Sequence, residues 1–163
     1  MATDFDTENR WYALKVYFNR VQPLLREAEE MGLERFAPTG VVGNLLFLRC
    51  REEQALRFAD RHWSHAWLYR ESSSRRPAAI PDAEMEVFRF VVSAGRSGLT
   101  LLGSDKPEYH EGDRVVVTGG PFKGAEGHIR RIKRDRRLVV AVRGVVAVAL
   151  AYIHPSLLRP VDE

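Results

Sequence analysis

The stretch GDRVVVTGGPFKGAEGHIRRI, Gly112–Ile132, holds two β-branched segments separated by a cluster of glycines. The first segment, Val115–Thr118, predicts a short strand, and His128–Arg131 predicts the strand that returns beside it. Glycine suits the bends between them because it tolerates backbone angles that other residues rarely adopt. The stretch therefore predicts a β-hairpin with Phe122 at the tip of its turn, where the ring can be offered to a partner.

The rest of the C-terminal third continues in short strands. Valine-rich segments at Leu138–Arg143 and Val145–Ala151 are bounded by turns at Asp135 and Gly144. Four or five such strands, without a helix long enough to cover a sheet, predict a small closed barrel, because an open sheet would leave long exposed edges. We expect this SH3-like barrel over residues 109–163, and its valines favour strands over a helical alternative.

The N-terminal part mixes strand and helix periods. The expected strands are Trp11–Tyr17, Leu33–Ala37, Leu45–Cys50 and Ala66–Tyr69, and the expected helices are Asn19–Met31, Glu52–Trp63 and one that begins near Asp82. Asn19 is the expected cap of the first helix, and Gly32 is its expected end. The order predicts an α+β protein: an α/β sandwich of one mainly antiparallel sheet with helices over residues 10–95, joined by a linker at 96–108 to the barrel. Residues 1–9 are expected to be flexible.

The composition of the 163 residues is that of an ordinary globular protein, with 45% hydrophobic and 29% charged residues. No apolar run approaches the length needed to span a bilayer, and the acidic N-terminus lacks the apolar core of a secretory signal. The single cysteine, Cys50, cannot form an internal disulfide, and one thiolate is too few for a cysteine-based zinc site. These features favour a cytoplasmic protein in a reducing compartment.

The net charge of +3 comes from the last third of the chain. Residues 1–103 hold 14 Lys and Arg against 14 Asp and Glu, whereas residues 104–163 hold 11 against 8. Six basic residues surround Asp135: Arg130, Arg131, Lys133, Arg134, Arg136 and Arg137. A solvated hairpin tip is the first interpretation of this run, and contact with RNA or the ribosome is the alternative.

Two parts of the chain resemble known families. The hairpin is similar to a KOW motif through Gly119, Gly120, Pro121, Phe122, Lys123, Gly124 and Gly127. Arg10-Trp11-Tyr12, the strand ending in Phe36-Ala37-Pro38, and Asn44 ahead of Leu45-Leu46-Phe47 resemble the N-terminal domain of NusG. Ile80-Pro81-Asp82 and residues 148–156 look closer to specialised paralogues of the UpxY type. The resemblance runs from about Arg10 to Val161.

This resemblance implies a transcription elongation and antitermination factor for a specific long operon, such as a polysaccharide cluster. The N-terminal domain would bind RNA polymerase through Tyr12, Asn44, Leu45 and Phe47. The KOW domain, with Phe122 at its turn, would recruit a ribosomal protein or another factor. From the residues alone, core packing is the competing interpretation for Tyr12, and which face of Leu45–Cys50 is exposed stays open.

One departure from the family concerns the connection at residues 39–43, where the family carries a β-hairpin that reaches toward the polymerase or the DNA. Here the gap holds five residues, which permit a tight turn. Candidates for contact with the non-template DNA strand or nascent RNA are instead Arg20, Arg75 and Arg76. For each of them an ordinary surface charge is the alternative.

Catalytic signatures are missing from the sequence, so an enzyme is not expected. GRSG at Gly95–Gly98 does not join a strand to a helix as a nucleophile elbow must, and GGPFKG lacks the lysine–hydroxyl pair of a phosphate loop. Arg61, His62 and His65 lack a third ligand, so neither a metal nor a cofactor is expected. The competing class is a ribosome-associated or RNA-binding KOW protein without polymerase binding.

Overall fold

The computed structural model describes residues 8–94, 99–103, 114–132, 135–142, 144–150 and 155–161. The chain divides into two units, Met1–Asp82 and Ala83–Glu163, which are described one at a time. In the described part of the chain, no helix is long and apolar enough to cross a membrane.

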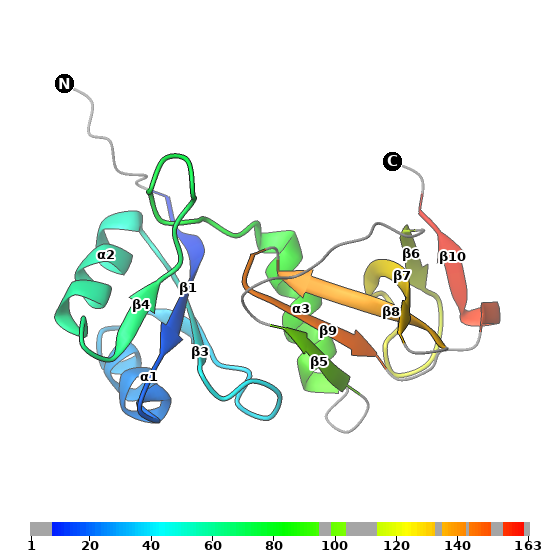
Figure 1. Ribbon diagram of the computed structural model, residues 1–163, viewed down its shortest axis with the longest axis horizontal. Coiled ribbons are helices and arrows are strands. Elements are labelled where there is room, and N and C mark those ends of the chain that lie inside the picture. Colours follow the sequence, from blue (N-terminus) through cyan, green and yellow to red (C-terminus); the bar gives the residue numbers. More distant parts are fainter. Residues whose placement is uncertain are drawn as a thin grey trace. The chain divides into compact units, whose positions relative to one another are not determined.

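A four-stranded antiparallel sheet forms the frame of unit 1, in the order β2-β3-β1-β4 (Figure 1). Its strands are β1 (Arg10–Val16), β2 (Glu34–Phe36), β3 (Leu45–Cys50) and β4 (Ala66–Leu68). The two central strands, β1 and β3, are buried along most of their length, as apolar strands with neighbours on both sides should be. All four strands expected from the sequence are present, each with bounds within one residue of the expectation.

Two helices, α1 (Val21–Glu30) and α2 (Glu52–Arg61), pack on one face of this sheet. Both helices have one apolar stripe, and the stripes meet alternate residues of the central strands. The buried cluster that results contains Tyr12, Leu14, Val16, Val21, Leu24, Ala28, Leu33, Leu46, Leu48, Cys50, Ala55, Phe58, Ala59, Ala66 and Leu68.

The two ends of α1 compare differently with the sequence. At its C-terminal end, Gly32 has φ +75°, its N–H bonds the Glu29 carbonyl, and the Leu33 N–H bonds the Ala28 carbonyl. This is the glycine stop expected from the sequence. The expected cap, Asn19, is wrong: the helix begins at Val21, so the N-cap position falls one residue after Asn19, which itself has φ +56°. Arg20 stands at the N-cap position instead, without a side-chain capping bond.

Unit 2 contains a six-stranded antiparallel sheet in the order β10-β6-β7-β8-β9-β5 (Figure 1). A helix, α3 (Asp82–Ala94), begins at the last residue of unit 1. The strands and the short 3-10 helix η1 are β5 (Leu99–Gly103), β6 (Arg114–Val117), β7 (Glu126–Ile132), β8 (Asp135–Val142), β9 (Val146–Leu150), η1 (Pro155–Leu157) and β10 (Leu158–Pro160). The expected fold class is confirmed: a mixed α/β part is followed by a small β domain.

One strand of unit 2 lies where the sequence predicts a linker. β5 falls within residues 96–108 and pairs with β9, with a register shift between Leu101 and Gly103. Gly95, Gly98, Gly103 and Pro107 predict a linker here, but the three leucines among residues 99–102 are apolar enough for an edge strand. The predicted domain limits at residues 95 and 109 remain predictions, and residues 1–7, 96–98 and 104–108 lie outside the described part.

Candidate docking surface

The two faces of β1 and β3 carry different residues because side chains alternate along a strand. Tyr12 lies opposite Leu48, and Ala13 lies opposite Phe47. Directly opposed residues share a face, so Tyr12 and Phe47 point to opposite sides of the sheet. The predicted polymerase-binding set therefore does not gather on one face.

Tyr12 is the clearest correction. Its side chain is 1% exposed and belongs to the cluster under α1 and α2. The period of β1 turns the Tyr12 ring toward the helices, so the ring offers no surface to a partner in this structure, and its contact with polymerase stays a prediction. The competing interpretation, core packing, is the one observed.

Leu45 and Phe47 lie on the face that α1 and α2 do not cover, yet both are 0% exposed. The Phe47 ring packs against Phe36 of β2, with ring centroids 6.3 Å apart. Asn44, just before β3, is partly exposed, and its carbonyl accepts a hydrogen bond from the Val16 N–H. The sequence left open which face of β3 is exposed. In the structure the apolar side chains on both faces are buried.

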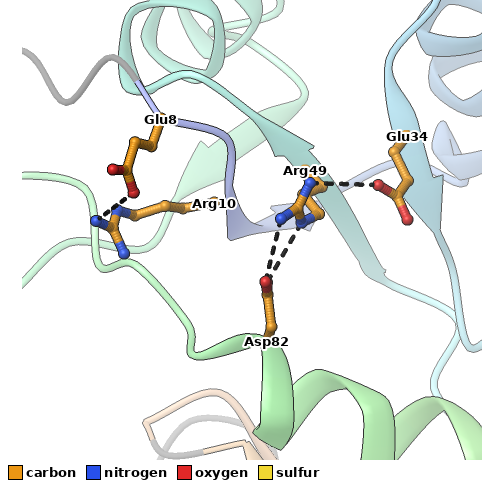
Figure 2. A network of polar contacts seen from close by, with 5 residues as sticks. All are labelled: Glu8, Arg10, Glu34, Arg49 and Asp82. Atoms are coloured by element: carbon orange, nitrogen blue, oxygen red, sulfur yellow. Dashed lines mark hydrogen bonds and ion pairs between the residues drawn. The ribbon is translucent and has the colours of Figure 1, made fainter.

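A charged network lies on the same side of the sheet, near the Cys50 end of β3 (Figure 2). Arg49 donates from Nε and Nη2 to the two carboxylate oxygens of Asp82, at 3.3 and 3.1 Å, and its Nη1 lies 3.8 Å from Glu34 Oε1. Glu34 is the cross-strand partner of Arg49. The hydrogen bond from Arg49 lowers the pKa of the Asp82 carboxyl and raises the pKa of the guanidinium. The network ties the first residue of α3 to β3.

Replacing Asp82 with asparagine should make unit 1 less stable at neutral pH by less than about 1 kcal/mol, since both partners are partly exposed. The lowered pKa means that the ionised form stabilises the fold above the unfolded pKa of about 3.9. That stabilisation is lost as the pH falls through the lower folded value. Urea midpoints should therefore converge for wild type and Asp82→Asn in acid, and a pH-independent difference would contradict the assignment.

The predicted nucleic-acid contacts are not brought together. Arg20 lies four residues after Val16, the last residue of β1. Arg75 and Arg76 lie in the loop that precedes Ile80, and Ile80 pairs with Trp11 at the first end of β1. The length of β1 separates the two sites by about 20 Å. Arg76 Nη2 also bonds both oxygens of the buried Glu52 carboxylate, at 3.0 and 3.1 Å. A contact of Arg76 with phosphate would compete with that pair.

The KOW turn is built as expected, except at its aromatic residue. Phe122 is 9% exposed, so it does not stand at the tip as an offered side chain. The Gly124 N–H donates to the Val117 carbonyl at 2.8 Å, so the turn closes back on the last residue of β6. The turn residues that are exposed are Gly120, Pro121, Lys123 and Gly124, while Gly119 and Gly127 are partly covered.

Of the basic run around Asp135, only the side chain of Arg137 lies in the described part of the chain. Its Nε donates to the Leu150 carbonyl and its Nη2 to Thr100 Oγ1, so it joins β8 to β9 and β5. This residue therefore has a structural role within unit 2. For the other five basic residues of the run, a solvated hairpin tip and contact with RNA or the ribosome both stay open.

Sequence reasoning missed a group of exposed aromatic residues at the α1 end of unit 1. We call Tyr17, Phe18, Trp63, His65 and Trp67 the aromatic end. Phe18 and Trp63 are 78% and 80% exposed, and Trp67 and Tyr17 are about half exposed. The Phe18 ring meets the His65 ring edge-on at 6.4 Å and the Tyr17 ring at 6.3 Å. The sequence signal that could have found this group is the aromatic pair Tyr17-Phe18, which directly follows β1.

Two observations concern metal-binding and thiol side chains among the described residues. These residues include no group of three or more His, Cys, Asp or Glu side chains that could hold a metal ion. Burial raises the pKa of the Cys50 thiol to about 11, which keeps it protonated at neutral pH.

Comparisons with known proteins match the C-terminal motif to one family model and the fold to one solved structure. Residues 111–143 match the family model of the KOW motif. A solved structure described as "Domain interaction in Thermotoga maritima NusG" matches with a TM-score of 0.53 and 15% identity, over 95% of this chain and 98% of that chain. A chain of the MjSpt4:Spt5 complex in conformation B matches with a TM-score of 0.29 and 12% identity, over 94% and 97%. No sequence among the curated proteins matches.

Proposed function

We propose that this chain is a transcription elongation factor that binds RNA polymerase through unit 1 and a second partner through its KOW domain. It works in the cytoplasm, where the polymerase is, and its mechanism is binding without bond-making. The unit on the polymerase gives the tethered KOW domain a high effective concentration near emerging RNA, so the affinity of that domain can be weak.

The observation that supports the proposal most is the extent of the fold similarity. The match to Thermotoga maritima NusG spans both units and nearly the whole of both chains, and the KOW motif lies in the C-terminal unit. Because a shared fold does not by itself give a shared function, the docking site must be tested directly.

The proposed docking face carries Leu45 and Phe47, and the partly exposed Asn44 directly precedes Leu45 in the chain. Leu45 and Phe47 are apolar, as the centre of a protein interface usually is. Both are buried, so docking through them requires that this face first be uncovered. Tyr12 is no longer part of the proposed face.

Asn44→Glu tests this face without changing the core. A carboxylate at the margin of an apolar interface must be desolvated on docking, so retention of RNA polymerase by the full chain should fall at least about ten-fold. Asn9→Glu makes the same amide-to-carboxylate change at an exposed position ahead of β1 and should retain polymerase normally. If Asn44→Glu co-purifies with polymerase as wild type does, the docking assignment is wrong.

For the KOW domain we propose that the exposed part of the turn, Pro121 and Lys123, meets the second partner, a ribosomal protein or another factor. Phe122 then supports the turn from inside. The competing function, a ribosome-associated or RNA-binding KOW protein, is favoured by the basic run of β7 and β8. A pull-down from lysate separates the two: polymerase subunits support the first, and ribosomal RNA without polymerase supports the second.

A specialised role in antitermination, as in paralogues of the UpxY type, is the finer proposal. It rests on Ile80-Pro81-Asp82 and on residues 148–156. A factor of this kind should raise read-through of a terminator only on a template that carries its recruiting sequence. Equal effects on unrelated templates would indicate a general elongation factor.

A further inference from the structure

The loop that joins β4 to α3 is closed on itself by backbone hydrogen bonds. The Glu71 N–H donates to the Arg76 carbonyl at 2.8 Å, and the Arg75 N–H donates to the Glu71 carbonyl at 2.9 Å. Arg75 has φ +63°, a left-handed conformation that an arginine rarely adopts. All residues from 70 to 76 are exposed, so this strained turn is open to solvent and to a modifying enzyme (Figure 1).

The Ser74 hydroxyl is the polar centre of this turn. It donates to Glu71 Oε1 at 2.7 Å, and its oxygen accepts a hydrogen bond from the Arg76 N–H at 3.2 Å. Within the described part of the chain, the neighbouring side chains of Ser72 and Ser73 make no such bond. A group attached to Ser74 Oγ therefore acts on both ends of the turn.

Arg76 couples the turn to the interior of unit 1. Its Nη2 donates to both carboxylate oxygens of Glu52, at 3.0 and 3.1 Å. Glu52 is 6% exposed and is the one charged residue that is buried among those the structure describes. Because a buried carboxylate that loses its partner is strongly destabilising, the position of Arg76 affects the stability of the whole unit.

The turn is also rich in positive charge. Residues 70–76 contain Arg70, Arg75 and Arg76 against one acid, Glu71. Arg70 Nη1 donates to the Arg75 carbonyl at 3.0 Å, which brings its guanidinium to the turn. A phosphoserine carries a charge of about −1.5 to −2 at pH 7, and arginines are its preferred partners. A phosphate on Ser74 would enter a segment that holds three guanidinium groups.

We propose that Ser74 is a phosphorylation site whose phosphate draws Arg76 away from Glu52. A protein kinase transfers the γ-phosphoryl group of ATP: Ser74 Oγ bonds to phosphorus, the bond to the β-phosphate oxygen breaks, ADP leaves, and the hydroxyl proton passes to a base of the kinase. The modified residue no longer donates to Glu71, and the two negative groups repel each other. The phosphate and the Glu52 carboxylate then compete for one guanidinium. The inference depends neither on the polymerase nor on any other part of the proposed function.

The first experiment asks whether the site is used. The full chain is isolated from its native cells in the presence of phosphatase inhibitors, in growing and in stationary cultures, and fragmentation mass spectrometry locates any phosphate. Phosphate on Ser74 supports the proposal. Phosphate on Ser72 or Ser73 alone, or on none of the three serines, overturns it.

The second experiment measures the consequence in the full chain, with phosphoserine incorporated at residue 74 during synthesis. Unfolding in urea is followed by tryptophan fluorescence, which reports on unit 1 because Trp11, Trp63 and Trp67 all lie there. Phosphate on Ser74 should raise the unfolding equilibrium constant about ten-fold. The matched control carries the phosphate on Ser72 and should unfold as the unmodified chain does.

Glu52→Gln separates this mechanism from simple disruption of the turn. A glutamine amide has no charge that needs Arg76, so in this background phosphate on Ser74 should change the equilibrium constant no more than about two-fold. Arg76→Gln tests the same coupling from the other partner and should also remove the effect. An equally large effect in these backgrounds, or no effect in the wild-type background, overturns the proposal. Each comparison is made within one background, so the cost of the substitution itself cancels.

Discussion

Tyr12→Ala is expected to lower the free energy of unfolding of unit 1 by about 3–5 kcal/mol, as removal of a large buried ring usually does. The ring is 1% exposed and packs under α1 and α2, so its loss leaves a cavity that the helices can close only in part. All three tryptophans, Trp11, Trp63 and Trp67, belong to unit 1, so tryptophan fluorescence in urea follows this unit.

The matched variant is Tyr17→Ala, five residues along the chain. Tyr17 is 44% exposed, and its removal should cost less than about 1 kcal/mol. The pair also separates stability from docking. If Tyr12→Ala unfolds at the urea concentration of wild type and yet fails to retain polymerase, the ring is a contact residue and its place in the core is wrong.

Gly127→Ala is expected to destabilise unit 2 on the order of 3 kcal/mol, because the added methyl group meets backbone. A Cβ at this position would lie 2.3 Å from the Val139 carbonyl oxygen and 3.1 Å from Leu138 Cδ1. Neither β7 nor β8 can move away from the added methyl group without breaking hydrogen bonds between the two strands. Hydrogen exchange of the β7 and β8 amides should therefore accelerate while tryptophan fluorescence of unit 1 is unchanged.

Gly119→Ala provides the comparison within the same motif. The nearest atom to its Cβ would be Leu157 Cδ2 at 3.2 Å, the end of a flexible side chain that can turn away. Its exchange rates should stay close to those of wild type. If Gly119→Ala and Gly127→Ala accelerate exchange equally, the glycines are needed for bending the chain. The close approach of residue 127 to Val139 would then not explain the effect.

Much of the fold could be predicted because it depends on local patterns. The four strands of unit 1 follow from aromatic and β-branched runs, and the Gly32 stop follows from the need for a left-handed residue after α1. β5 could not be predicted in the same way. β5 (Leu99–Gly103) is an edge strand whose only neighbour in the described sheet is β9, so its ladder forms only when β9 is in place.

The candidate site was harder to predict from the sequence than the fold, because the exposure of its side chains depends on distant segments. Tyr12, Leu45 and Phe47 all have the character of interface residues, but an apolar side chain suits a core equally well. Phe122 lies at a predicted turn tip, yet its side chain is 9% exposed, and the local sequence carries no sign of that burial. The aromatic end joins residues 17–18 to residues 63–67, which no local pattern connects.

The periodicities of this chain are enough to define its elements, the order of its two parts and the KOW hairpin, since these depend on neighbours a few residues away. The periodicities do not decide whether a given side chain is buried or exposed. Whether Tyr12 faces helices or solvent, and whether Phe18 meets His65, depends on strand pairing between segments some fifty residues apart. Folding brings those segments together, and only then does one apolar residue become core while another is left exposed.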